Sequence, residues 1–109
     1  MKIRVGFVSN SSSTAFIVDS TADGAEAYLR EARKELIGRL DHGRASCVAN
    51  AEEMREYVKD EWDYCDDFIL AGILDLGDNA VYVRISDEHM CGWYMNPPVN
   101  IIHSVEEWH

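Results

Sequence analysis

The sequence predicts an α+β fold, in which an antiparallel or mixed sheet of four to five strands has two helices packed on one face. Two stretches have apolar residues at helical spacing, and several shorter runs alternate apolar with polar residues or are rich in β-formers. The chain has 109 residues, of which 47% are hydrophobic and 28% charged, and this suits one domain around one core. Residues 1–109 are therefore predicted to form a single domain.

The first segment is predicted to be a β-hairpin. Residues 2–8, KIRVGFV, alternate as a half-buried strand does, and residues 15–19, AFIVD, form a second run of β-formers. Residues 9–14, SNSSST, have the Ser and Asn content of a loop, and their number suits a hairpin connection. A phosphate-binding role for these serines lacks the glycine-rich P-loop pattern.

The stretch GFVSNSSSTAFIV is similar to an N-terminal signature, approximately R-x-G-F-V-S-N-S-S-S-S-S-F-I-V, of uncharacterised phage and bacterial proteins. The similarity covers residues 4–18, and the chain departs from the pattern at Thr14 and Ala15, where serine is usual. The resemblance implies a phage or mobile-element setting. It implies no activity, so it assigns no role to any residue.

Residues 23–40 are predicted to form the first helix. Asp23 and Glu26 have the spacing of a capping box, and Gly43 is suitably placed to end the helix. Half of the positive charge of the chain lies in residues 30–44, but acids are interleaved with it, so a solvated mixed face is expected. The apolar residues at helical spacing are Ala25, Tyr28, Leu29, Ala32, Leu36 and Leu40.

Residues 50–67, NAEEMREYVKDEWDYCDD, hold eight acids against two bases and are predicted to form an acidic amphipathic helix. Asn50 and Glu53 have capping-box spacing, so the helix should begin at about Ala51. The acids that share the outward stripe are Glu52, Glu53, Glu56, Asp60 and Asp63. The opposite, apolar face consists of Met54, Tyr57, Val58, Trp62 and Cys65.

This helix is expected to end near Asp60. Glu61 would fall within the apolar face, where an unpaired carboxylate is costly, so either the helix ends near Asp60 or Glu61 has a partner. Asp66 and Asp67 would be unfavourable at a helix C-terminus, where the helix dipole repels anions.

The remaining strands are predicted from shorter runs. Residues 44–49 are either a strand or a connection. Residues 68–76, FILAGILDL, form an almost continuous apolar run that predicts a buried central strand. Residues 77–79 have turn chemistry, and residues 80–86 alternate, so these two strands should make a hairpin in the middle of the sheet.

The C-terminal part is predicted to end in an edge strand. Residues 87–98 hold several large side chains beside a glycine and two prolines, which predicts an ordered loop or a short strand. Residues 99–103, VNIIH, follow the two prolines and suit an edge position, because proline cannot donate to a central strand ladder.

The net charge of −10 is concentrated in one part of the chain: residues 1–50 carry +1 and residues 51–109 carry −11. Such a surface disfavours direct binding of nucleic acid and of anionic membranes, and it attracts basic proteins or cations. Three cysteines, an odd number without a CxxC motif, argue against a disulfide framework and favour the cytoplasm. No run approaches the 18 apolar residues of a membrane span.

No motif for catalysis or metal binding is present, so we expect no cofactor, no metal and no enzyme activity. Cys65, His89, Cys91 and His103 are zinc-ligand types, but their spacing matches no zinc motif. The acids of residues 75–79 do not make an EF-hand. A nucleophile would need a base held by a third group, and the sequence does not bring Cys91 together with either histidine.

The function predicted from these features is binding to a basic host protein. A helix can hold carboxylates about 5–6 Å apart, in a row that imitates a phosphate strand. Such a row suits the nucleic-acid channel of a nuclease, polymerase or repressor, which the protein would inhibit or modulate. The predicted partner-binding residues are Glu52, Glu53, Glu56, Asp60, Asp63, Asp66 and Asp67, with Trp93 and Tyr94 as apolar anchors.

Two alternatives remain open at this point. The chain can be a structural or accessory domain whose acidity only keeps it soluble, with self-association through an edge strand. A metal-dependent enzyme is the third class.

Overall fold

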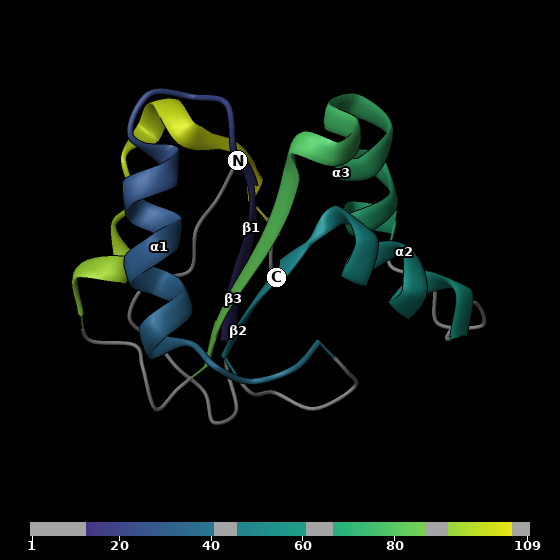
Figure 1. Ribbon diagram of the computed structural model, residues 1–109, viewed down its shortest axis with the longest axis horizontal. Helices are drawn as coiled ribbons and strands as arrows, with labels where there is room; N and C mark the ends of the chain where they lie inside the picture. The colour runs from purple at the N-terminus through teal and green to yellow at the C-terminus, as the bar shows by residue number, and fades with distance from the viewer. Residues whose placement is uncertain (1–12, 41–45, 61–66, 87–91, 106–109) are drawn as a thin grey trace.

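A computed structural model describes residues 13–40, 46–60, 67–86 and 92–105, which form a four-stranded sheet with helices on both faces (Figure 1). This confirms the predicted α+β class. The strands are β1 (Ser13–Asp19), β2 (Cys47–Asn50), β3 (Ala80–Ser86) and β4 (Ile102–Val105). The α-helices are α1 (Ala25–Glu35), α2 (Ala51–Asp60) and α3 (Asp67–Leu76). Three 3-10 turns are η2 (Gly77–Asn79), η4 (Trp93–Met95) and η5 (Val99–Ile101).

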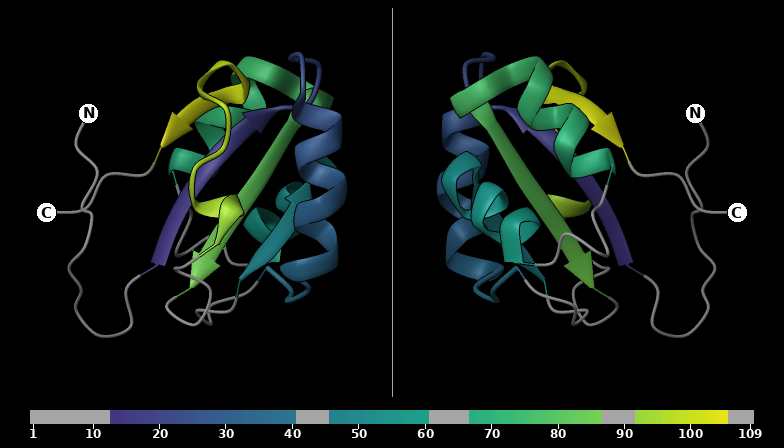
Figure 2. Two further views of the ribbon diagram at one scale, coloured as in Figure 1. Left: turned by 90° about the vertical axis from the view of Figure 1, so that its left-hand side faces the viewer. Right: turned by 90° about the vertical axis from the view of Figure 1, so that its right-hand side faces the viewer.

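The strand order is β2-β3-β1-β4, and every neighbouring pair is antiparallel (Figure 2). Strands β1 and β2 therefore run in the same direction with β3 between them, which makes β1-α1-β2 a split β-α-β unit. The central position predicted for residues 80–86 is confirmed. Strand β1 has β3 on one side and β4 on the other; the hairpin partner predicted for it, residues 2–8, lies outside the described residues.

Two core layers form because successive side chains of a strand point to opposite faces. On one face, Phe16 and Val18 of β1 pack with α1. On the other face, Ala15 and Ile17 pack with α2 and α3. All seven residues of β3 are buried, because both of its faces are covered. Two helices share one face, as the predicted arrangement has it, but they are α2 and α3. Helix α1, which was predicted to lie beside α2, covers the opposite face.

The prediction for residues 68–76 was wrong, because this segment is helix α3. Ile69 and Gly72 are buried, three residues apart, while Ala71 and Leu74 are exposed, so burial follows a helical period. An almost unbroken apolar run does not distinguish a buried strand from a helix. The predicted hairpin with residues 80–86 is therefore absent, and η2 instead joins helix α3 to β3.

Two glycines make this helix-to-strand arrangement possible. A Cβ on Gly72 would lie 3.0 Å from side-chain carbons of Ile17, so the missing side chain lets α3 approach β1 closely. Gly77 follows the helix with φ +60°, the left-handed conformation that glycine adopts without strain and that commonly ends helices.

Helix α1 is shorter than predicted at both ends. Its N-cap is Gly24, without a side-chain cap, so the predicted capping box of Asp23 and Glu26 is not formed. At the other end, Leu36 leaves the helical conformation and is buried. Gly38 then bridges to Cys47 and its N–H donates to the Ser46 carbonyl at 2.9 Å, so tertiary pairing ends the helix before Leu40.

The remaining predictions differ from the structure mainly in their boundaries. Of the ambiguous residues 44–49, those from Cys47 onward belong to strand β2, and residues 44 and 45 lie outside the described residues. The predicted edge strand at 99–103 begins at Ile102 instead, after the turn η5, and it lies at an edge of the sheet that the described residues form. None of the helices in the described segments is long and apolar enough to cross a membrane.

Candidate docking surface on helix α2

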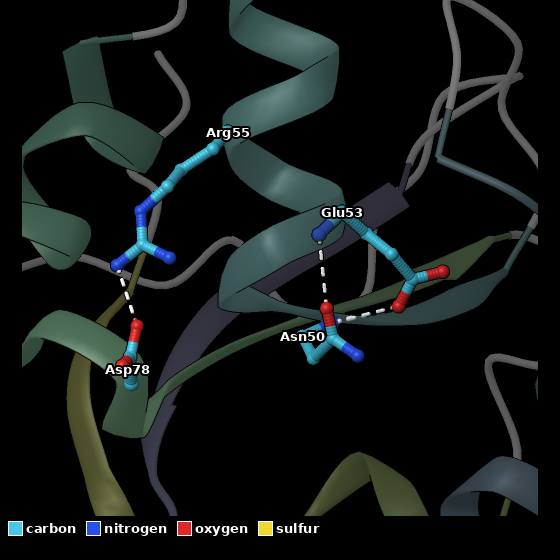
Figure 3. A network of polar contacts seen from close by, with 4 residues as sticks. All are labelled: Asn50, Glu53, Arg55 and Asp78. Atoms are coloured by element: carbon cyan, nitrogen blue, oxygen red, sulfur yellow. Dashed lines mark hydrogen bonds and ion pairs between the residues drawn. The ribbon is translucent and has the colours of Figure 1, made fainter.

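The start of α2 is held by a capping box (Figure 3). The Glu53 N–H donates to Asn50 Oδ1 and the Asn50 N–H donates to Glu53 Oε1, both at 2.9 Å. This confirms the prediction from their spacing, and the helix begins directly where strand β2 ends. The Glu53 carboxylate is consequently used inside the fold, so it contributes less to an outward stripe than the sequence predicted.

The inner face of α2 fixes which side chains point outward. Ala51 and Met54 are buried against the sheet, and Tyr57 and Val58 are half-buried beside them. Glu52 and Glu56 are exposed on the other side. They are four residues apart, which places their Cβ atoms about 5–6 Å from each other. Neither makes a hydrogen bond or ion pair with another residue of the described segments.

Arg55 is drawn away from this pair of acids (Figure 3). Its Nη2 donates to Asp78 Oδ1 of η2 at 2.8 Å, and both side chains are largely exposed. An exposed ion pair of this kind contributes about 0.2–1 kcal/mol, so it holds η2 against α2 only weakly. It nevertheless gives Arg55 an anionic partner other than Glu52 and Glu56.

The other predicted acids are placed less favourably for a single stripe. Asp60 is the last described residue of α2, and Asp63 and Asp66 lie outside the described residues. Asp67 does not end the acidic helix but begins α3, where an exposed carboxylate is favourable beside the positive end of the helix dipole. The unfavourable position inferred from sequence thus becomes a favourable one.

The two predicted aromatic anchors lie on the opposite side of the molecule. Tyr94 is 8% exposed and belongs to the core layer of α1, where its carbonyl accepts the Tyr28 hydroxyl at 2.8 Å. Trp93 is 47% exposed and packs edge-on against Tyr28. Figure 1 shows α1 and α2 on opposite sides of the sheet. The structure therefore does not bring Trp93 and Tyr94 together with the carboxylates of α2.

Sequence reasoning missed Leu74 and Asp75, because it assigned residues 68–76 to a buried strand. Leu74 is 83% exposed on α3, on the same side of the sheet as α2. Asp75 Oδ2 lies 3.2 Å from Nε2 of His103, a residue of β4. Helical periodicity over residues 67–76 is the signal that would have found both.

No metal site is assembled in the part of the chain that the structure describes. Those segments contain no group of three or more His, Cys, Asp or Glu side chains suited to hold an ion. Of the four zinc-ligand types singled out from the sequence, Cys65, His89 and Cys91 lie outside the described residues, and His103 pairs with Asp75.

Together, fold and surface define an acidic α+β domain with a split β-α-β unit and outward carboxylates on α2. Comparisons with protein-family models, with curated proteins and with solved structures found no match to this chain.

Proposed function

We propose that this protein binds a basic, nucleic-acid-handling host protein through the outward face of α2 and inhibits or modulates it. The observation that carries the proposal is the pair Glu52 and Glu56, which are exposed, one turn apart, and without an ion-pair partner in the described segments. The capping box anchors the start of their helix, so the carboxylates are presented from a well-defined element.

The proposed mode of binding is imitation of a phosphate strand. The −11 charge of residues 51–109 would attract a basic channel from a distance and speed association, and it would keep nucleic acid itself away. A nuclease, polymerase or repressor has such a channel. The similarity of residues 4–18 to phage and bacterial proteins supports a phage setting, and the odd number of cysteines supports a cytoplasmic one.

Charge alone rarely supplies affinity, so an apolar anchor is also needed. Leu74 is suitable for this part, because it is exposed and lies on the same side of the sheet as α2. We therefore assign it the role that the sequence suggested for Trp93 and Tyr94.

The alternative is an accessory domain whose acidity serves solubility alone. The use of Glu53 and Asp78 inside the fold favours it, since those carboxylates are not reserved for a partner. Self-association through sheet edges is less well supported. Edge strands β2 and β4 have four residues each, and Gly38 bridges to Cys47 at the start of β2.

Charge reversal on α2 tests the proposal. The variant carries Glu52→Lys and Glu56→Lys, and its control carries Glu31→Lys and Glu35→Lys on α1, which have the same spacing and the same change in net charge. Partners captured by the wild-type protein from host lysate at low salt are identified. The dissociation constant of each partner is then measured at several salt concentrations for the wild type and for both variants.

We expect the α2 variant to lose a basic nucleic-acid-binding protein that the α1 control retains, and binding to weaken as salt rises. Nucleic acid should compete for the same partner. Equal loss with both variants would indicate a net-charge effect and contradict a specific role of α2. Binding without competition by nucleic acid would contradict mimicry.

A further inference from the structure

Strand β4 contains a β-bulge that changes where its side chains point. Along the β1–β4 ladder, Ile17 pairs with Ser104, but the next residue, Val18, pairs with Ile102. His103 is therefore an extra residue without a partner position in the ladder. A bulge of this kind redirects side chains and is common beside functional sites.

The bulge brings the side chains of two consecutive residues together. In a regular strand, neighbouring side chains point to opposite faces. Here His103 Nδ1 lies 3.2 Å from Ser104 Oγ, within hydrogen-bond reach. Ser104 pairs with Ile17, which belongs to the core layer of α2 and α3, and His103 also faces α3.

The third member of the group comes from α3. Asp75 Oδ2 lies 3.2 Å from His103 Nε2. When the His103 ring is neutral, an ionised Asp75 carboxylate, which can only accept a hydrogen bond, favours the tautomer with its hydrogen on Nε2. The other nitrogen, Nδ1, is then the acceptor that faces the Ser104 hydroxyl. Asp75, His103 and Ser104 thus form a chain in which an oriented base contacts a nucleophile.

We propose that Ser104 is a nucleophile for acyl transfer from small activated esters, with His103 as its general base and Asp75 as the residue that orients the base. This activity is independent of the binding function proposed for α2, and it departs from the expectation, drawn from the sequence, that the chain has no enzyme activity. The side chain of Asp75 is mostly exposed and that of His103 is about one quarter exposed, so the group is accessible from solvent at the sheet edge. Such an open site suits a small ester that can react without being enclosed in a pocket.

The reaction balances within this group. The Ser104 oxygen attacks the carbonyl carbon of the ester and its proton moves to His103 Nδ1. The bond to the leaving alkoxide breaks, and the alkoxide takes that proton and departs as an alcohol. Water then attacks acyl-Ser104 with proton transfer to Nδ1, the acid is released, and the serine regains its proton.

The negative oxygen of the tetrahedral intermediate needs hydrogen-bond donors. Strand β4 lies at the edge of the described sheet, with β1 on one side. Backbone N–H groups on the side of β4 away from β1 have no partner strand within the described sheet, and such groups can donate to this oxygen.

The test uses the whole 109-residue chain with p-nitrophenyl acetate and with a fluorophosphonate reagent. We expect a burst of p-nitrophenol on mixing, and covalent labelling that peptide mapping places on Ser104. Ser104→Ala should abolish both, while Ser20→Ala, at a partly exposed serine after β1, should keep both. The α2 variant Glu52→Lys with Glu56→Lys should also keep both, which separates this site from the docking surface.

Base catalysis has a readout that a structural role would not change. His103→Gly should lower the rate by roughly 100-fold or more, and added imidazole should restore part of it. Asp75→Asn should lower kcat on the order of tenfold or more with KM almost unchanged, and Asp75→Glu should recover part of the loss. Circular dichroism of each variant checks that the fold is retained.

Labelling that persists in Ser104→Ala would overturn the proposal. So would labelling of Ser104 at an equal rate in folded wild type and folded His103→Gly, or a complete absence of labelling in the wild-type protein. In those cases, the contact between Asp75 and His103 is a tie between α3 and β4.

Discussion

At the scale of single residues, the fold alters the pKa of Tyr28 and of Asp19. The Tyr28 hydroxyl is buried and donates to the Tyr94 carbonyl, and burial raises the pKa of Tyr28 above its usual 10. The Asp19 carboxylate accepts the Thr21 hydroxyl at 2.6 Å and the Thr21 N–H at 2.9 Å, and these bonds lower the pKa of Asp19 below 3.8. Each shift links stability to pH, with opposite signs.

Tyr28 should make the fold sensitive to alkaline pH. Below about pH 10 the hydroxyl is neutral in both states, whereas at higher pH the unfolded chain loses this proton and the folded chain keeps it. The free energy of unfolding should then fall by up to about 1.4 kcal/mol per pH unit from this group. Tyr28→Phe should show a shallower fall above pH 10, and at neutral pH it should lose about 0.5–1.5 kcal/mol with the hydrogen bond to the Tyr94 carbonyl. Urea unfolding from pH 8 to 11 measures both effects.

Asp19 should make the free energy of unfolding depend on pH in the acid range. Its lowered pKa means that the contribution is present above about pH 4 and is lost as pH falls through the folded-state value. Thr21→Val removes the hydroxyl donor, which is the largest cause of the shift, and keeps the backbone N–H. An NMR pH titration should therefore show the pKa of Asp19 moving part of the way back toward 3.8. An unchanged pKa would assign the shift to the backbone N–H of Thr21 and to the neighbouring His103.

At the scale of elements, local and tertiary effects decide different helix ends. Helix α2 begins where its side chains predict, because the capping box is a local interaction over three residues. Helix α1 does not end where its sequence predicts, because Leu36 enters the core and Gly38 pairs with Cys47. Residues 67–76 form helix α3 although their almost continuous apolar run is typical of a buried strand. As a helix, the segment buries one side against Ile17 and exposes the other.

The capping box should be measurable as a coupling energy. Asn50→Ala should lower the free energy of unfolding by about 0.5–2 kcal/mol, since the Glu53 N–H loses its acceptor. Glu53→Ala should cost less, and the double variant should cost less than the sum of the two, because the interactions are reciprocal. Strict additivity in urea unfolding would indicate that the two bonds act independently.

Gly72 should reject a methyl group although alanine is the better helix former. Alanine gains about 1 kcal/mol of helix propensity over glycine. Its Cβ would lie 3.0 Å from carbons of Ile17, which is fully buried in the core, and overpacking of this kind costs about 1–3 kcal/mol. We expect Gly72→Ala to be destabilising, and Ile17→Val to reduce that penalty in the double variant. A stabilised Gly72→Ala would show that α3 moves away from β1 at little cost.

At the scale of the whole molecule, the sheet lies between the α2 carboxylates and the aromatic pair Trp93 and Tyr94, which were predicted from the sequence to form one binding site. Helix α2, which bears the carboxylates, lies on one side of the sheet and α1 on the other (Figure 1). Trp93 packs against Tyr28 of α1. Separation by the sheet means that mutations on the two sides should act independently on binding.

Partner binding should therefore respond to Leu74 and not to Trp93. Leu74→Ala should raise the dissociation constant of the captured partner by roughly tenfold or more if Leu74 fills an apolar pocket of that partner, because an anchor contributes more than 1 kcal/mol. Trp93→Ala should leave the dissociation constant unchanged. Calorimetry with the purified partner measures both. Loss of binding with Trp93→Ala in a folded protein would place the interface on the α1 side.

The α+β class, the central strand 80–86, the first turn of α2 and the outward direction of Glu52 and Glu56 follow from the sequence itself. These features depend on the alternation of side chains and on interactions between residues close in the chain, which the order of residues specifies. The helical state of residues 67–76, the end of α1 and the bulge at His103 were decided by tertiary structure. Each depends on contacts between residues distant in sequence: Gly72 with Ile17, Gly38 with Cys47, and β4 with β1. For the same reason only the folded chain places Asp75 beside His103 and Trp93 on the side away from α2, since the face that each element covers is set by the path of the whole chain around one sheet.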